Sequence, residues 1–218
     1  MRTDFDPGEM SARAFYKLLN SVVVPRPIAW VASTSADGVE NLAPHSFFTV
    51  SCVDPPIVQF TSVGEKDSLR NVTETGEFTI SLTPEWLFEQ VNATGTDFPA
   101  HQGEFEAVGV DREPSLRVAP PRVAQSPAVL ECRLERTLPL GDSTLVLGRV
   151  VHAVVDSDAL VDGRPDIHLL APLARLGADE WSTIGTVLEI TRIRHRDWPG
   201  HYDPEASENE PGDASANT

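Results

Sequence analysis

Lysine is scarce in this sequence: Lys17 and Lys66 stand against 15 arginines. Basic residues number 17 against 33 acidic ones, so the 218-residue chain carries a formal net charge of −16. That charge excludes a generally basic surface of the kind that coats nucleic acid. Because arginine stands in for lysine almost throughout, each lysine that remains is a candidate for a specific role.

Cysteine and long apolar segments are also sparse. Cys52 and Cys132 make no metal-binding spacing, and we expect two reduced, buried hydrophobic side chains. No apolar run approaches the roughly 18 residues that cross a bilayer. The N-terminus carries acids where a signal peptide would be basic. The sequence therefore predicts a cytoplasmic protein with no membrane segment.

Motifs for the common nucleotide and hydrolase sites are missing. The chain has neither GxGxxG nor GxxxxGK[ST], so a Rossmann or P-loop site has no support. It has neither GxSxG nor HExxH, and its 6 histidines are too dispersed to propose a metal site. No catalytic nucleophile and no metal are expected.

The C-terminal composition differs from the rest of the chain. Residues 199–218 contain acids but no Lys or Arg and few apolar groups. Such a segment cannot bury enough surface to offset the entropy of ordering. We predict one folded domain over residues 1–198 and an acidic disordered tail over residues 199–218.

Three short helices are predicted. Residues 11–20 place an apolar stripe behind Ser11, which is a plausible N-cap. Residues 66–74 and 84–93 are two further candidates, and the second opens on Pro84, a residue favoured at the first helical position.

Strand signals dominate the rest of the chain. Seven segments rich in Val, Ile, Thr and aromatic residues alternate with turn signals. They are residues 28–34, 43–53, 56–63, 77–82, 128–140, 143–155 and 185–194. This spacing favours a mainly β fold, and a barrel rather than a doubly wound sheet.

Two stretches could hold a ligand. Residues 41–49 gather an amide, an imidazole and hydroxyls beside two phenylalanines, which suits a planar ligand. The alternative is a barrel strand with Phe47 or Phe48 in the core. Residues 61–71 pass from strand hydroxyls through a glycine turn to a helix start. Free N–H groups there, with Lys66, could bind an anion. A solvated lysine with no ligand is an equally good interpretation of Lys66.

Two arginines and one loop complete the candidates. Arg26 lies between prolines and Arg175 lies in an apolar stretch, so each could bind a phosphate or merely pair with an acid. The polar loop over residues 92–106 is long enough to be a functional lid, or else is disordered.

These motifs occur together in one order. PRPIAWVAST, NLAPHSFFTVSCVDPP, KDSLRNVTETGEF, NATGTDFPAHQGEFEAVGV, PPRVAQSPAVLECRL and PLARLG follow one another within residues 10–180. In this order they resemble the flavin reductase-like family, the FMN-binding split barrels in their long form. The resemblance implies a mainly β, six-stranded antiparallel split β-barrel with short peripheral helices, and FMN bound at a homodimer interface.

The resemblance also implies an activity. Members transfer hydride from NADH or NADPH to flavin, which makes this chain an NAD(P)H:flavin oxidoreductase that could supply reduced flavin to a partner monooxygenase. Two alternatives stay open: a flavoredoxin-like FMN-binding electron carrier without efficient NAD(P)H turnover, and a barrel that has lost flavin and serves as an interaction module. The cofactor supplies the reactivity, so no catalytic side chain is required.

Site residues follow from the resemblance by position. The expected flavin contacts are Arg26, Trp30, Thr34, Asn41, Ala43, Pro44, His45, Ser46, Phe47, Ser62, Lys66 and Arg175. Among them Ser46, Ser62 and Lys66 are expected at the phosphate, with Arg26 as a further candidate. The expected contacts on the nicotinamide side are Thr96, Asp97 and His101. Relatives commonly carry an aromatic residue at the position of His45.

Overall fold

The computed structural model describes residues 1–195 and residue 198. The predicted tail over residues 199–218 lies outside the described residues. The chain divides into one unit from Met1 to Ile184 and a second from Gly185 onward, and the architecture below is that of the first unit. No helix in the described part of the chain combines the length and the apolar character that crossing a membrane requires.

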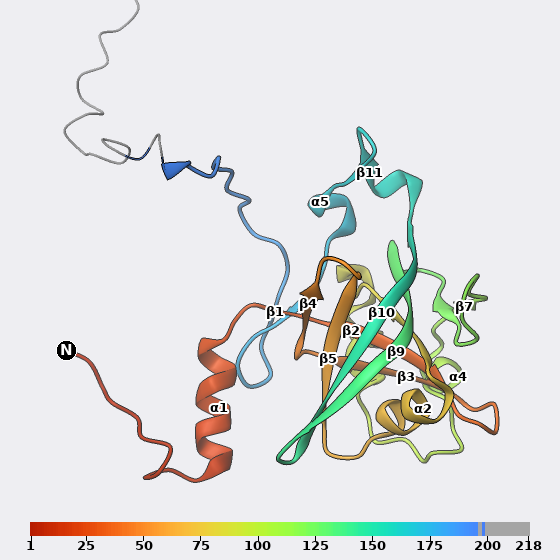
Figure 1. Cartoon of the computed structure of the whole chain (residues 1–218), viewed down its shortest axis with the longest axis horizontal. Helices are drawn as coiled ribbons and strands as arrows, with labels where there is room; N and C mark the ends of the chain where they lie inside the picture. Colours follow the sequence, from red (N-terminus) through yellow and green to blue (C-terminus); the bar gives the residue numbers. More distant parts are fainter. Residues whose placement is uncertain (196–197, 199–218) are drawn as a thin grey trace, which may run out of the picture. The chain divides into compact units, whose positions relative to one another are not determined.

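A seven-stranded antiparallel sheet forms the body of the first unit (Figure 1). Its order is β3-β2-β6-β9-β10-β5-β4. The strands are β2 (Ala29–Thr34), β3 (Glu40–His45), β4 (Phe48–Cys52), β5 (Ile57–Val63), β6 (Glu77–Ser81), β9 (Ala128–Leu140) and β10 (Ser143–Val155). The prediction of a mainly β fold is confirmed. The expected number of six strands is not, because the sheet has seven.

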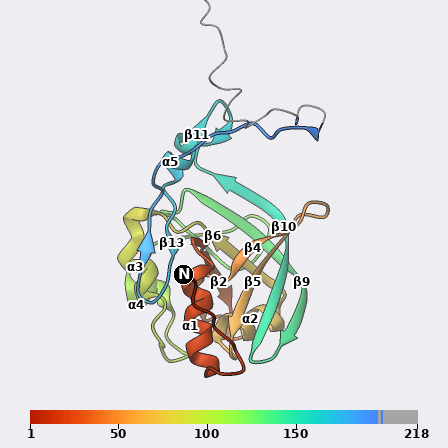
Figure 2. The ribbon, with the colours of Figure 1, turned by 90° about the vertical axis from the view of Figure 1, so that its left-hand side faces the viewer.

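The two edge strands, β3 and β4, are consecutive in the chain. Only Ser46 and Phe47 separate them, so the sheet has to curve until its edges approach each other (Figure 2). The backbone N–H of Thr61 donates to the carbonyl of Phe47 at 2.9 Å and ties this crossing to β5. The sequence predicted one strand over residues 43–53, and the chain instead breaks into two strands at opposite edges.

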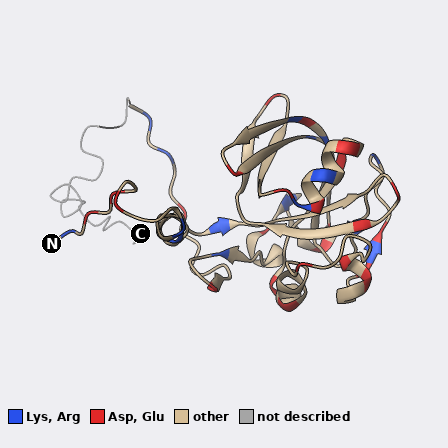
Figure 3. Cartoon of the chain, turned by 90° about the horizontal axis from the view of Figure 1, so that it is seen from below, with Lys and Arg blue, Asp and Glu red and all other residues tan. Residues whose placement is uncertain are grey.

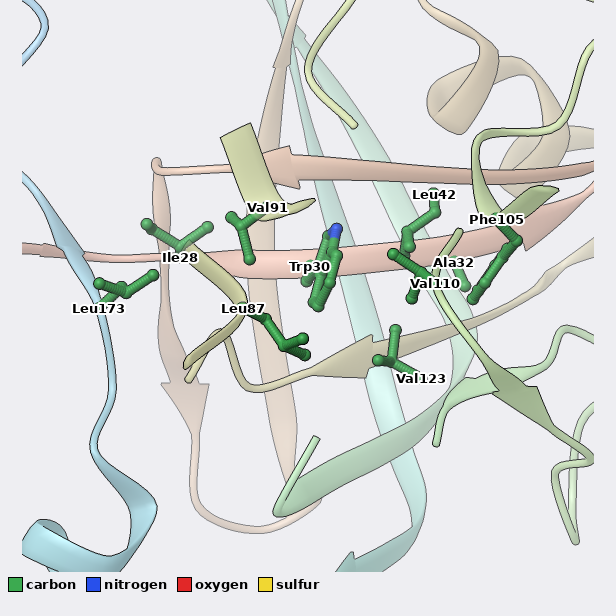
Figure 4. Close-up of a cluster of buried hydrophobic side chains, with 10 residues drawn as sticks. All are labelled: Ile28, Trp30, Ala32, Leu42, Leu87, Val91, Phe105, Val110, Val123 and Leu173. Atoms are coloured by element: carbon green, nitrogen blue, oxygen red, sulfur yellow. The ribbon is translucent and has the colours of Figure 1, made fainter. Parts of the chain in front are cut away.

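Strand β2 is buried on both faces and separates two apolar cores. Ala29 and Val31 pack on one side with Phe60 and Phe78. The other core is drawn in Figure 4 and contains Ile28, Trp30, Ala32, Leu42, Leu87, Val91, Phe105, Val110, Val123 and Leu173. A strand buried on both faces shows a continuous rather than an alternating apolar run, as residues 28–32 do.

Short helices surround the sheet. They are α1 (Ala12–Val22), α2 (Asp67–Thr75), α3 (Phe88–Ala93), α4 (Glu104–Val108) and α5 (Ile167–Leu170), with 3-10 turns at Glu85–Leu87 and Ser157–Ala159. Ser11 caps α1 as predicted, its Oγ accepting from the backbone N–H of Ala14 at 3.2 Å. The predicted helix over residues 84–93 is a 3-10 turn followed by α3.

Three small sheets complete the unit. They pair β7 (Arg112–Glu113) with β8 (Arg122–Val123), β11 (Leu160–Val161) with β12 (Arg164–Pro165), and β1 (Arg26–Pro27) with β13 (Ala174–Arg175), which also pairs with β14 (Trp181–Ser182). Arg26 thereby lies opposite Arg175, and Arg175 lies opposite Trp181.

Residues 185–194 form no strand in the structure, so the strand predicted there was wrong. The segment has apolar residues of high β propensity, but a strand exists only where a neighbouring strand takes its backbone hydrogen bonds.

Acidic residues are spread over the loops and helices around the sheet (Figure 3). Some pair with arginines: Glu40 lies 2.8 Å from Arg112, and Glu135 lies 2.9 Å from Arg149. Exposed ion pairs of this kind contribute little to stability. The negative charge therefore acts mainly on the approach of charged ligands.

Candidate functional site

A cavity of about 400 Å³ opens beside the crossing between the two edges of the sheet. Its walls come from β3 and the crossing, the end of β5, the start of α2, the loop after α3, the start of α4 and α1. The lining residues are Tyr16, Asn41, Ala43, Pro44, His45, Ser46, Phe47, Thr61, Val63, Glu65, Lys66, Asp67, Ser68, Thr94, Gly95, Thr96, Asp97, Phe98 and Glu104. Elements far apart in sequence thus share one concave site.

Nine of the residues proposed from the sequence meet in this cavity. They are Asn41, Ala43, Pro44, His45, Ser46, Phe47, Lys66, Thr96 and Asp97. Six of them lie on β3 and the crossing, where the chain passes from one edge of the sheet to the other. Strand β3 is an edge strand of the described sheet and has a neighbouring strand, β2, on one side only.

Strand β5 turns Thr61 and Val63 toward the cavity and Ser62 away from it. Successive side chains of a strand point to opposite faces, and Val58, Phe60 and Ser62 are the buried set of β5. Ser62 is fully buried, and its Oγ donates to the carbonyl of Gly64 at 3.0 Å. Ser62 therefore does not line the cavity, and the hydroxyl that does is that of Thr61, which sequence reasoning missed by one residue.

Helix α2 begins at the rim of the cavity. Lys66 occupies its N-cap position in an extended conformation and makes no side-chain capping bond, so the first-turn N–H groups have no side-chain acceptor there. The Asp67 carboxylate pairs instead with Arg70 at 2.5 Å. Uncapped N–H groups beside a lysine ammonium make this the positive end of the site.

A chain of buried polar groups forms the floor of the cavity. His45 Nε2 lies 3.2 Å from Ser68 Oγ, and Ser68 Oγ donates to Asn41 Oδ1 at 2.9 Å. Asn41 Nδ2 donates to Glu104 Oε1 at 2.9 Å, and the backbone N–H of Leu42 donates to Glu104 Oε2 at 2.8 Å. The contact with Glu104 fixes which end of the Asn41 amide faces Ser68.

Burial shifts the two titratable ends of this chain in opposite directions. Burial lowers the pKa of His45 to about 4, and the positive charge of Lys66 adds to that effect. Burial raises the pKa of Glu104, although the hydrogen bonds from Leu42 and Asn41 oppose the shift. His45 is therefore neutral at physiological pH.

Glu104 and Ser68 were not proposed from the sequence. In the sequence Glu104 is one polar residue of the loop predicted over residues 92–106, where no helix was expected, and its partner Asn41 is 63 positions away. Ser68 reads as an ordinary first-turn residue of α2. Sequence spacing holds no signal for either contact.

The Arg26 guanidinium is hydrogen-bonded to backbone carbonyls. Its Nη1 donates to the carbonyls of Asn20 and Val23 at 2.6 and 3.1 Å, and its Nη2 donates to that of Leu176 at 2.8 Å. These bonds join the end of α1 to the segment after β13. Arg26 is buried and does not line the cavity.

Three other proposed residues also lie outside the lining. Trp30 is fully buried in the core of Figure 4, where its Nε1 donates to Thr94 Oγ1 at 2.8 Å. Thr34 ends β2 at its junction with the turn to β3, and His101 is exposed on the loop before α4. Trp30 thus acts on the site indirectly, by holding Thr94, which does line it.

A second cavity of about 230 Å³ adjoins the first. Its lining residues are Ile28, Pro44, Ser46, Asn92, Gly95, Arg175 and Trp181. Pro44, Ser46 and Gly95 line both cavities, so the two cavities share a wall. Arg175, proposed from the sequence as a cofactor contact, belongs to this second cavity and not to the first.

Comparison with known proteins gives one consistent result. Residues 21–170 match the family model described as the flavin reductase like domain. An uncharacterized protein of Halalkalibacterium halodurans is 36% identical over 199 residues, covering 86% of this chain and 95% of that protein.

Two solved structures are similar over most of the chain. Nitrilotriacetate monooxygenase component B from Bacillus cereus superimposes with a TM-score of 0.84 at 31% identity, covering 87% of this chain and 99% of the other. The 2-nitrobenzoate 2-nitroreductase NbaA of Pseudomonas fluorescens gives a TM-score of 0.82 at 28% identity, covering 88% and 98%.

Proposed function

The chain belongs to the flavin reductase-like family of split-barrel proteins, and on that basis we propose that it is an FMN-binding oxidoreductase that transfers hydride from NAD(P)H to flavin. The observation that carries the proposal is the position of Lys66. This lysine and the uncapped start of α2 face the same cavity as Asn41 and residues 43–47. One cavity therefore offers an anion site together with a wall of polar and apolar side chains.

The donor set suits FMN. A phosphate at the start of α2 would accept hydrogen bonds from the first-turn N–H groups, from Thr61 and from the Lys66 ammonium. The aromatic rings of Tyr16 and Phe47 also line this cavity and offer apolar surface to a flat ring system. At about 400 Å³ the cavity is within the size range of sites for drug-sized ligands.

Two of the four acids in the lining are engaged by groups of the protein. Asp67 is paired with Arg70, and Glu104 accepts hydrogen bonds from Asn41 and Leu42. The other two, Glu65 and Asp97, lie on the rim segments before α2 and after α3. Lys66 has no carboxylate partner among the ion pairs of the described residues, which leaves it available to an anionic group.

When bound, FMN supplies the hydride chemistry, since its ring accepts a hydride from a reduced nicotinamide. The residues of this chain bind and orient the reactants. Lys66 and α2 anchor the phosphate, the β3–β4 crossing carries the ring, and the loop with Thr96 and Asp97 covers the nicotinamide side. The neutral His45 provides a polar floor without placing a second positive charge in the site.

We also propose two associations. The apolar face of α1, with Tyr16, Leu19 and Val22 exposed in one chain, is covered by a second copy of the chain in a homodimer. The reduced flavin is passed to a partner monooxygenase, a role that the similarity to nitrilotriacetate monooxygenase component B supports.

Flavin titration tests the phosphate contact. Lys66→Ala should weaken FMN binding about tenfold, because one charge-assisted contact is lost, while riboflavin, which lacks the phosphate, should bind both forms equally. Lys17→Ala is the matched control, since it removes the other lysine, which lies on α1 outside the cavity lining. Equal loss of FMN and riboflavin would show damage to the fold, and unchanged FMN affinity would remove Lys66 from the site.

Oxidation of NADH and NADPH by the FMN-loaded protein tests the activity. We expect consumption of at least one of them, dependent on added or bound FMN. A protein that binds FMN but does not oxidise either donor would be an electron carrier of the flavoredoxin kind. A protein that binds no flavin would contradict the proposed function altogether.

A further inference from the structure

Two arginines face each other across a strand pair beside the second cavity. Arg26 on β1 is the register partner of Arg175 on β13. Like charges placed directly opposite in a sheet are destabilising. Burial lowers the pKa of Arg26, Tyr16 opposes that shift, and the nearby charge of Arg175 adds to it by a smaller amount. Two like charges in register are unfavourable unless other groups compensate them.

No carboxylate in the described part of the chain compensates these two charges. The ion pairs there join Arg70, Arg112, Arg122, Arg133 and Arg149 to acids, and neither Arg26 nor Arg175 is among them. This is unexpected in a chain with 33 acidic residues. Arg26 donates to three backbone carbonyls, whereas Arg175 makes one hydrogen bond with the described residues, from Nη2 to the carbonyl of Ala178 at 3.0 Å.

Arg175 is nevertheless held in one orientation. Its guanidinium lies over the Trp181 ring, 4.6 Å from the centroid, and Trp181 in turn packs edge-on against Phe88. A cation on an aromatic face is attracted by the ring. The contact leaves the Nε and Nη1 donors of Arg175 without a protein acceptor among the described residues. An oriented cation with spare donors, in a cavity wall, is the arrangement that binds an anion.

The rest of the cavity sets the size and shape of that anion. Ile28, Pro44 and Trp181 form apolar walls, and Ser46 and Asn92 offer further polar groups. A cavity of roughly 150 Å³ holds a benzene molecule. At about 230 Å³ this cavity has room for one substituted ring and is too small for a whole dinucleotide.

We propose that the second cavity binds a single-ring organic carboxylate, with Arg175 as the residue that binds its carboxylate group. Because Pro44, Ser46 and Gly95 line both cavities, the ring of this ligand lies next to the site assigned to FMN. The location beside flavin rests on the proposed function, but binding of the anion does not, because Arg175, which binds the carboxylate group, lines the second cavity and not the first.

Benzoate and benzamide test the proposal, since they share a ring and differ in charge. Isothermal titration of the purified full-length protein, with and without FMN, should give benzoate an affinity at least tenfold higher than benzamide. Arg175→Gln should weaken benzoate binding about tenfold and leave benzamide binding unchanged. Arg175→Lys keeps the charge and should retain part of the benzoate affinity, which also covers the case in which the glutamine variant fails to fold.

Arg149→Gln is the matched control, because it removes an arginine whose exposed side chain pairs with Glu135 on the β9–β10 hairpin. It should bind benzoate as the wild type does. Equal affinity for benzoate and benzamide in the wild type would overturn the proposal, as would unchanged benzoate affinity in Arg175→Gln. The proposal would also be overturned if the wild type did not bind benzoate and Arg175→Gln raised the KM for NADH. That result would assign the cavity to the nicotinamide donor.

The two proposals fail separately. If neither the wild type nor any variant bound flavin, the proposed function would be contradicted. Benzoate binding to the FMN-free protein could still be measured in that case. Conversely, a protein that binds FMN and oxidises NAD(P)H but ignores benzoate would keep the proposed function and lose the carboxylate site.

Discussion

His45 lies at the centre of the cavity floor, packed against Phe60 with 4.7 Å between ring centroids. Its Nε2 is within hydrogen-bond distance of Ser68 Oγ, whose single proton is also within reach of Asn41 Oδ1. A phenylalanine in its place could pack against Phe60 but could not join this chain of polar groups. Protonation of His45 would therefore change the hydrogen bonds of the cavity floor.

Substitution of His45 by phenylalanine should remove a pH dependence of stability. An ordinary histidine has a pKa near 6.5, and burial lowers the pKa of His45 to about 4, so the unfolded chain takes up the proton first. The contribution of His45 is present above pH 6.5 and is lost as pH falls toward 4. Between about pH 7.5 and about pH 5 the wild type should lose about 2 kcal/mol of unfolding free energy through this group.

Urea unfolding at both pH values measures the effect. The quantity of interest is the change with pH, which should be about 2 kcal/mol smaller in His45→Phe, because the other histidines and acids are the same in both proteins. Parallel loss of stability in the two proteins would contradict the buried, neutral state of His45.

At the scale of elements, α4 fastens the loop that lines the cavity. The helix spans Glu104–Val108 and is too short to be stable alone. It is held by Phe105 in the core and by the two hydrogen bonds of Glu104 to β3. Gly103 permits the approach, since a Cβ there would lie 2.6 Å from the carbonyl oxygen of Glu40. The loop over residues 94–103 is thereby anchored at its far end.

Removal of the Glu104 carboxylate should loosen this loop. Glu104→Ala leaves two buried donors, Asn41 Nδ2 and the Leu42 N–H, without their acceptor, and each such loss costs about 1–3 kcal/mol. We expect a lower unfolding free energy and faster proteolysis within residues 94–103. Glu106→Ala, on the exposed side of the same helix, is the control and should change neither. Proteolysis at the wild-type rate in Glu104→Ala would show that the loop is held by other contacts.

At the scale of the whole molecule, α1 is amphipathic but has no buried residue in the single chain. Tyr16 from this helix lines the main cavity, and Leu19 and Val22 are 46% and 63% exposed. An apolar helix face left in water favours association. Because α1 also contributes to the cavity wall, association through this face would bring a second copy close to the flavin site.

A homodimer formed through α1 should be visible in its mass. Light scattering coupled to gel filtration should give twice the mass of one chain at micromolar concentration. Leu19→Glu with Val22→Glu should give a monomer, since both charges fall on the apolar face, whereas Lys17→Glu on the polar face should stay dimeric. A single-chain mass for the wild type would contradict the homodimer, and a dimeric double variant would place the interface elsewhere.

Much of the fold and part of the site were predictable because their signals are local. Alternation and turn residues placed β5, β6, β9 and β10, and Ser11 placed the start of α1. The order of six motifs pointed to the family, and the run over residues 41–47, with Lys66, pointed to the wall and the positive end of the cavity. These features depend on neighbouring residues, which a sequence displays directly.

Tertiary structure decided what depends on distant residues. Residues 43–53 were predicted as one strand, but the closing of the sheet divides them between its two edge strands, β3 and β4. The sequence left Arg26 open between a phosphate and an acidic partner, and in the structure it donates instead to backbone carbonyls, among them that of Leu176, 150 positions away. Glu104 meets Asn41 only because α4 packs on β3. The sequence by itself determines the backbone preference and the chemical character of each residue. The partner of a buried polar group is decided by packing. A buried polar group without a hydrogen bond is costly, so it pairs with the group that the fold places next to it.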